Sequence, residues 1–229
     1  MNARATPLPQ PTRWAVLAGA LLGAWLGGVA HAATVQVTVL ASDGQPLPNA
    51  VVILEPTNSG APPKAPPPTD VVITQEKMQF VPALTVVPVG SRVTFTNLDR
   101  WEHHVRGLPA GLAGLTAAPG SGFELRLDSK AEGLPAASST VTLERVGPMQ
   151  LGCHLHGSMR GSLYVSDTPW VVKTNADGVA TLPDVPEGAA RVRVWHVDQL
   201  IEAAPTPLTV TTVTAVNLDT RIQPRKRRK

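Results

Sequence analysis

The sequence CHLHGSM at residues 153–159 decides how the rest of the chain is interpreted. It places a thiolate, an imidazole and a thioether at Cys153, His156 and Met159, each three residues after the last. The stretch follows an apolar segment typical of a strand, so one short loop can turn all three side chains toward one point. His103 follows a second predicted strand and can supply another imidazole from a neighbouring loop.

These donor types select a metal. Two imidazoles and a thiolate with a weak thioether are the ligands of a blue-copper electron-transfer site. Structural zinc sites use Cys and His without Met, and catalytic zinc keeps a position for water. We therefore expect one mononuclear copper ion as the cofactor, with His104 as the alternative to His103. Otherwise His104 and His154 brace the site, face solvent or form an auxiliary metal site. The expected ligands are His103, Cys153, His156 and Met159.

Residues 71–167 resemble the cupredoxins, most closely the amicyanin and plastocyanin branch, and also bacterial cupredoxin-like proteins of the methylamine utilization type. The resemblance implies a Greek-key β-sandwich, copper ligation by the four residues above, and His156 as the electron port. Glu102 and His104 stand where the family often has Pro and Asn. The motifs that carry the resemblance are Phe80-x-Pro82, Val89-Gly90-x-x-Val93-x-Phe95-x-Asn97, His103-x-Val105 and Cys153-x-x-His156-x-x-Met159-x-Gly161.

Short apolar-alternating segments between Gly and Pro turns predict an all-β fold for the whole chain. Residues 34–54 are predicted as a hairpin, residues 107–121 as a long loop, and Leu208–Leu218 as one final strand.

The segments that flank the copper-binding region resemble two parts of a small Ig-like or transthyretin-like sandwich of the carboxypeptidase regulatory type. We expect residues 33–56 and 168–218 to form this split sandwich. The cupredoxin domain, 71–167, would then be inserted after a Pro-rich linker, 57–70. The rival arrangement is two independent modules in series.

The two ends of the chain are basic. Residues 1–32 are predicted to be a signal peptide: Arg4 and Arg13 precede an apolar run, and cleavage is expected after Ala32. A retained membrane anchor is the alternative. Residues 219–229 are predicted to be a disordered basic tail. A periplasmic or secreted location follows from the signal.

Eight of the 20 Lys and Arg lie in residues 1–32 and 221–229, whereas all 17 acids lie in residues 33–220. A nucleic-acid-binding protein would need basic residues on its folded region, so the class of nucleic-acid-binding proteins is excluded. Membrane contact is expected only through the tail. The lone Cys153 cannot form an internal disulfide, which favours metal binding in an exported protein.

These features predict a monomeric one-electron carrier that exchanges electrons with a redox partner protein. A copper-binding or copper-handling protein without electron transfer is the alternative. An enzyme is not expected. The five histidines after residue 32 are too few for the trinuclear cluster of a multicopper oxidase, although a trimer resembling nitrite reductase stays open. No nucleophile–base pair or phosphate loop stands out.

Overall fold

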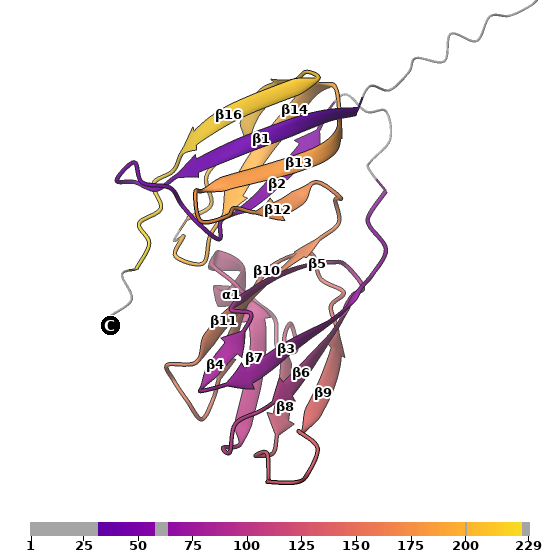
Figure 1. Ribbon diagram of the computed structural model, residues 1–229, viewed down its shortest axis with the longest axis vertical. Coiled ribbons are helices and arrows are strands. Elements are labelled where there is room, and N and C mark those ends of the chain that lie inside the picture. Colours follow the sequence, from indigo (N-terminus) through magenta and orange to yellow (C-terminus); the bar gives the residue numbers. More distant parts are fainter. Residues whose placement is uncertain (1–31, 58–63, 200, 226–229) are drawn as a thin grey trace, which may run out of the picture.

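The computed structural model describes residues 32–57, 64–199 and 201–225, and this part of the chain is almost entirely β-structure. The expected all-β class is confirmed. The strands form four sheets in two stacked units, called the upper and the lower unit after their places in Figure 1. The predicted signal peptide lies outside the described residues except for Ala32, where the first strand begins. Among the described residues, no helix is long and apolar enough to cross a membrane.

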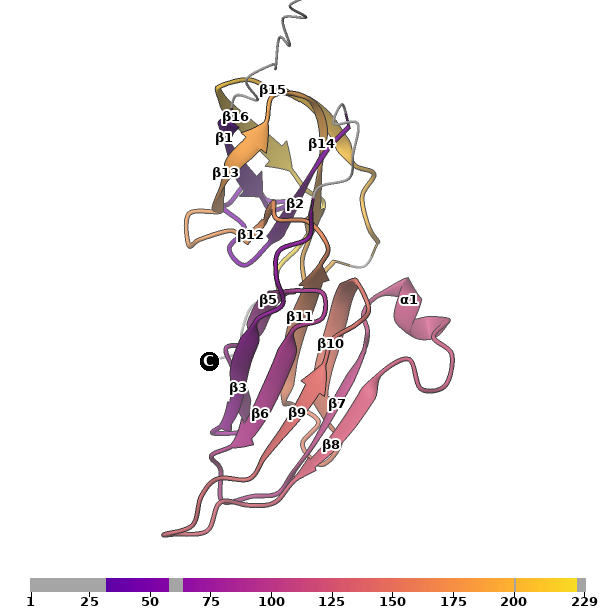
Figure 2. The same cartoon turned by 90° about the vertical axis from the view of Figure 1, so that its right-hand side faces the viewer.

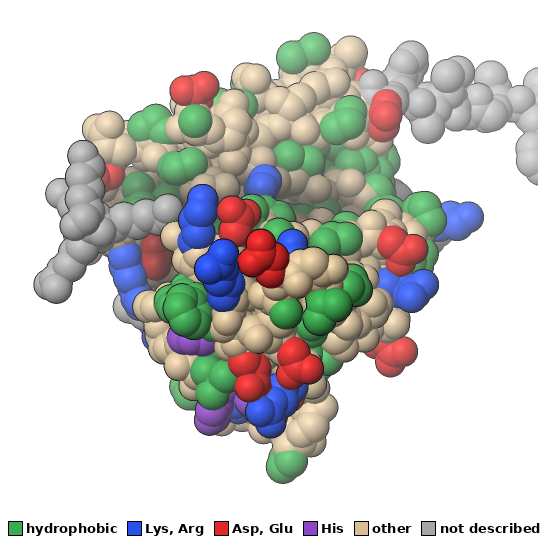
Figure 3. Space-filling model, turned by 60° about the horizontal axis from the view of Figure 1, so that its bottom comes forward, with side chains coloured by type: hydrophobic (Ala, Val, Ile, Leu, Met, Phe, Trp, Pro, Cys, Tyr) green, Lys and Arg blue, Asp and Glu red, His purple; other side chains and the backbone are tan. Residues whose placement is uncertain are grey.

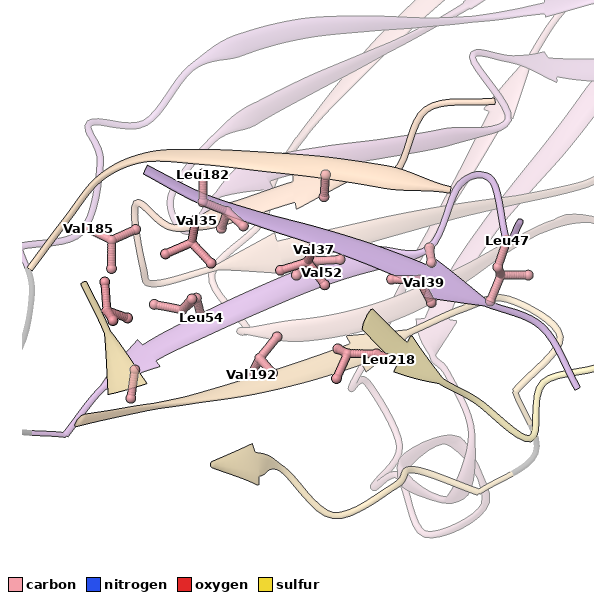
Figure 4. Packing of buried hydrophobic residues seen from close by; sticks show 14 of the residues in the cluster. Val35, Val37, Val39, Leu47, Val52, Leu54, Leu182, Val185, Val192 and Leu218 are labelled. Carbon is pink, nitrogen blue, oxygen red and sulfur yellow. The ribbon is translucent and has the colours of Figure 1, made fainter. Parts of the chain in front are cut away.

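The upper unit is a sandwich of a three-stranded sheet, β13-β1-β16, and a four-stranded sheet, β12-β2-β14-β15. Alternation along β1 turns Val35, Val37 and Val39 inward, where they face Val52 and Leu54 of β2 (Figure 4). The strands are β1 (Ala32–Leu40), β2 (Val51–Pro56), β12 (Val171–Lys173), β13 (Val179–Pro186), β14 (Gly188–Trp195), β15 (Thr206–Val210) and β16 (Val213–Asp219).

The predicted hairpin over residues 34–54 is wrong, because β1 and β2 lie in different sheets. β1 pairs with β13 and, in parallel, with β16, whereas β2 pairs with β12 and β14. Residues Val51 to Leu54 are all buried, so β2 is covered on both faces and belongs in the middle of its own sheet. The predicted single strand Leu208–Leu218 is two strands, separated at Thr211 and Thr212. The packed chain also reaches Ile222, inside the segment predicted as a tail.

The lower unit packs a five-stranded sheet, β5-β11-β10-β7-β8, against a four-stranded sheet, β4-β3-β6-β9. Phe80, Phe95, Leu151 and Leu163 fill the space between them. The predicted loop over 107–121 starts later than expected, because β7 continues to Pro109, and it contains the short helix α1 (Leu112–Leu115). The strands are β3 (Asp70–Glu76), β4 (Gln79–Val81), β5 (Leu84–Pro88), β6 (Arg92–Asn97), β7 (His103–Pro109), β8 (Phe123–Leu127), β9 (Ser138–Thr142), β10 (Gly147–Cys153) and β11 (Arg160–Ser166).

The junction between the units is a small apolar cluster of Val51, Ile53, Tyr164 and Trp195. The rings of Tyr164 and Trp195 are 5.8 Å apart between centroids. Strand β3 begins and β11 ends at the junction end of the lower unit (Figure 2). That the units are separate domains, one inserted in the other, stays a prediction of the sequence.

Strand direction determines which residues meet at the far end of the lower unit. β3, β6 and β10 run away from the junction, while β7 starts at the far end. Asn97, His103 and Cys153 therefore lie together at the end opposite the upper unit.

Candidate metal centre

Three of the four predicted ligands converge at this end. His103, Cys153 and His156 each offer one ligand atom, and these atoms all lie within 4.8 Å of one another. The Cys153 Sγ is 3.7 Å from Nδ1 of His103 and 3.4 Å from Nδ1 of His156. The imidazole rings are 4.9 Å apart between centroids. Both imidazoles thus direct the same kind of nitrogen at one sulfur.

The local backbone explains the convergence. Alternation along β7 buries His103 and leaves His104 on the outer face of the sheet, so His103 is the histidine that joins the cluster. β10 ends at Cys153, and the chain then returns in a tight loop: Met159 N–H donates to His156 O at 2.9 Å, and Cys153 N–H donates to Met159 O at 3.3 Å. This loop brings the imidazole of His156 back over the end of the strand.

Met159 is the fourth predicted ligand. It ends the loop between β10 and β11 and lies in the same buried hydrophobic cluster as Cys153. Its side chain is only 1% exposed. Phe80 lies in this cluster too, and Gly161, the second residue of β11, packs directly against the Phe80 ring: a Cβ at this glycine would come within 3.1 Å of it. The side chain of Met159 is therefore almost completely screened from solvent.

Asp99, which the sequence analysis missed, orients the buried His103. Its Oδ2 is 3.0 Å from His103 Nε2. Burial alone would raise the pKa of Asp99, but hydrogen bonds from the Met78 N–H, the His103 ring and the Lys77 N–H lower it below its usual value. An ionised carboxylate can only accept, so His103 donates through Nε2 and turns the Nδ1 lone pair toward Cys153. The sequence did contain one indication of this role: an acid, Asp99, stands four residues before His103.

The loop between β6 and β7 is braced from both sides. The Asn97 side-chain amide donates to Trp101 O at 2.7 Å and to Asp128 O at 2.9 Å, which ties this loop to the end of β8. Glu102 forms an ion pair with Arg126 of β8, and the hydrogen bond from Arg126 lowers the pKa of Glu102. Asn97 and Glu102 therefore hold the loop between β6 and β7 against β8.

The cluster lies just beneath the molecular surface. His103 is fully buried and Cys153 nearly so, whereas His156 is half-buried. Exposed Leu155 and Trp101 belong to the two loops that carry the cluster. Figure 3 looks onto this end of the molecule, where histidine, hydrophobic and charged side chains share the surface. His156 is thus the most exposed member of the cluster.

No protein-family model and no curated protein sequence matches the chain. Among solved structures, the chain is similar to cupredoxins, as its motifs predict. A reduced amicyanin variant is 21% identical over 42% of this chain and 82% of its own, with a TM-score of 0.33. A purple cupredoxin from Nitrosopumilus maritimus is 20% identical over 42% of this chain and 100% of its own, with a TM-score of 0.32.

A third similar structure is a copper-containing nitrite reductase from Thermus scotoductus, 20% identical over 49% of this chain and 25% of its own, with a TM-score of 0.34. At these identities and TM-scores the matches carry no argument about function. The choice of a metal therefore depends on the geometry of the cluster and the chemistry of its donors.

The donor set fits copper better than other metals. Two imidazole nitrogens and a cysteine sulfur lie within 4.8 Å of one another, and a thioether is buried in the same hydrophobic cluster as the cysteine. Thiolate and thioether favour Cu(I), while imidazole suits both copper oxidation states. A zinc site would leave the buried thioether without a role. His103, Cys153 and His156, with Met159 beside them, are the residues that would hold the ion.

Proposed function

We propose that this protein is a type 1 copper protein that carries single electrons in the periplasm. The observation that carries the proposal is the convergence of two imidazole Nδ1 atoms on the Cys153 sulfur, with ligand atoms within 4.8 Å of one another. When bound there, copper supplies a one-electron redox couple.

In this proposal the protein fixes the orientation of the ligand side chains and buries most of them away from solvent. Asp99 fixes the tautomer and the ring of His103, and the hydrogen bonds of the loop fix His156 over the sulfur. Donors that are fixed before an electron arrives need little rearrangement afterwards, which favours rapid transfer. Cys153 is buried, so its sulfur is shielded from the oxidation that an exposed thiol outside the cytoplasm would undergo.

His156 serves as the electron port in this proposal. It is the half-buried member of the cluster, and the exposed Leu155 beside it offers an apolar contact for a redox partner protein. We propose further that the chain is exported by its N-terminal signal, works as a monomer, binds one copper ion at this cluster and has no catalytic activity of its own.

The test is the absorption spectrum of the copper-loaded, oxidised full chain. An intense band near the red end of the visible spectrum is expected, and Cys153→Ser should abolish it because the thiolate-to-copper transition is lost. The matched control is Ser158→Ala in the same loop, which removes a hydroxyl that takes no part in the cluster. A colourless oxidised holoprotein would refute the proposal.

The same protein distinguishes a carrier from a copper-handling protein. Stopped-flow mixing with a small one-electron reductant should bleach the band within milliseconds if electrons exchange freely. Tight Cu(I) binding with slow bleaching would instead support copper handling.

A further inference from the structure

A second group of metal-binding side chains lies on the outer face of the five-stranded sheet. His104 follows His103 in β7, and His154 follows Cys153 at the end of β10. Their backbones are joined by a hydrogen bond from His154 N–H to His104 O at 2.9 Å. Because side chains alternate across a strand, His104 points away from the buried cluster on the other face of the sheet.

The two outer imidazoles are close enough to share one ion. Their ring centroids are 5.6 Å apart, compared with 4.9 Å for His103 and His156 in the buried cluster. Two imidazoles on one tetrahedral ion, with metal–nitrogen bonds of about 2.0–2.1 Å, place their centroids roughly 5 Å apart. A rotation of these partly exposed side chains closes the remaining gap.

A carboxylate stands beside them. Glu124 lies on the neighbouring strand β8, and its Oε2 is 3.5 Å from His104 Nε2. Its side chain is about half exposed, so it can follow an ion. A cavity of about 320 Å³ adjoins this group: Arg106 and His154 line it, together with Cys153 and Met159. His154 therefore borders an opening, His104 lies beside His154, and Glu124 lies beside His104.

Arg106 shows how this group is organised without an ion. Its Nε is 2.9 Å from Glu124 Oε1, and its Nη1 lies 3.4 Å from Nδ1 of His154. A guanidinium can only donate, so the Arg106 side chain directs N–H groups toward both the imidazole of His154 and the carboxylate of Glu124. The arginine occupies the place of a cation between an imidazole and a carboxylate. Its side chain is about one-third exposed and can swing into solvent.

We propose that His104, His154 and Glu124 form a second, surface metal site for a borderline divalent cation, zinc(II) or copper(II). Imidazole and carboxylate donors suit these ions, whereas the absence of a sulfur donor among the three side chains disfavours copper(I). Arg106 competes with the metal for Glu124 and His154. Its three side chains are distinct from those of the buried cluster, although His104 and His154 directly follow His103 and Cys153 in the chain.

The experiment titrates zinc(II) into the full chain whose first site already holds copper, and follows the heat of binding and the bound metal after gel filtration. One further equivalent of zinc is expected, with the visible band unchanged. His104→Gln and His154→Gln should each weaken that second equivalent by at least about tenfold, and Glu124→Gln should weaken it less. Glu144→Gln, an exposed acid elsewhere in the lower unit, is the matched control and should change nothing.

Arg106→Gln provides the opposite test. Removing the competing charge should tighten zinc binding by about tenfold, an effect that a purely structural arginine would not produce. The titration is repeated in Cys153→Ser, so that a failure of the copper proposal does not affect the result for the outer site. Copper(II) in place of zinc identifies which ion binds more tightly. The proposal is overturned if no second equivalent binds, or if binding persists in the His104→Gln, His154→Gln double variant.

Discussion

The Asp99 carboxylate lies 3.0 Å from Nε2 of His103, and the backbone N–H groups of Lys77 and Met78 hold that carboxylate at 2.6 and 2.8 Å. The hydrogen bonds run from the turn between β3 and β4, through an acid, to a fully buried imidazole. Such an outer partner sets the orientation of a metal-binding histidine and makes it a stronger donor. At the proposed metal centre, Asp99 would therefore act on His103 without touching the ion.

Asp99→Asn tests this control. The neutral amide would make His103 a weaker ligand for copper. A weaker ligand destabilises copper(II) more than copper(I), so the reduction potential should rise. A tenfold change in the relative affinity for the two oxidation states corresponds to about 59 mV for one electron, and we expect a rise of that order in a redox titration. Asp128→Asn, an exposed acid near the same loops, should leave the potential unchanged. An unaltered potential in Asp99→Asn would show that the carboxylate only supports the fold.

Met159→Gln tests the thioether. Gln is close in size and offers an amide oxygen, a harder donor that stabilises copper(II) relative to copper(I). The variant should keep copper and its visible band, with a lower reduction potential than the parent protein. Met149→Gln, a nearly buried methionine in the same core on β10, is the comparison. It should destabilise the fold without moving the potential. Loss of copper from Met159→Gln alone would mean that the thioether is needed for binding.

That His103, Cys153 and His156 lie together was easier to predict from the sequence than the architecture around them. Cys153 and His156 are only three residues apart, and the strand ends at Cys153. A short loop after this strand therefore brings the His156 ring close to the cysteine sulfur. The pairing of β1 with β16 is not local, because the alternation of Val35, Val37 and Val39 shows that one face is buried but not which strand lies beside it. Asp99 lies only four residues before His103, but the turn at Lys77 and Met78 that holds its carboxylate is distant in sequence and could not be predicted.

The junction between the units gives a stability prediction. Trp195 is 8% exposed and packs on Tyr164 between the upper and the lower unit. Trp195→Ala should lower the free energy of unfolding by about 3–5 kcal/mol, the usual cost of truncating a large buried aromatic residue. Urea denaturation followed by circular dichroism measures it. Val213→Ala at an exposed position should stay within about 0.5 kcal/mol of the parent. A small effect at Trp195 would mean that the units hardly depend on each other.

Protonation of the buried His196 is expected to make the free energy of unfolding depend on pH. It follows β14 and is 6% exposed, and its Nδ1 accepts a hydrogen bond from Asp198 N–H at 3.2 Å. Burial lowers its pKa below the ordinary value of 6.5, although Asp198 and a hydrogen bond with the Pro48 backbone oppose the shift. The unfolded chain therefore binds this proton more readily than the folded one. The contribution of His196 to stability is fully present above about pH 6.5 and is lost as the pH falls toward the lower folded pKa.

His196→Gln should remove that part of the pH dependence. Between pH 7.5 and pH 5.5 the parent protein should lose more unfolding free energy than the variant, as measured by urea denaturation at each pH. The variant itself should be less stable at pH 7.5, because Gln cannot keep every hydrogen bond of the ring. His154→Gln is a matched control, because His154 is exposed. Equal slopes for the parent and the His196 variant would show that the buried ring is not the group that makes the fold sensitive to mild acid.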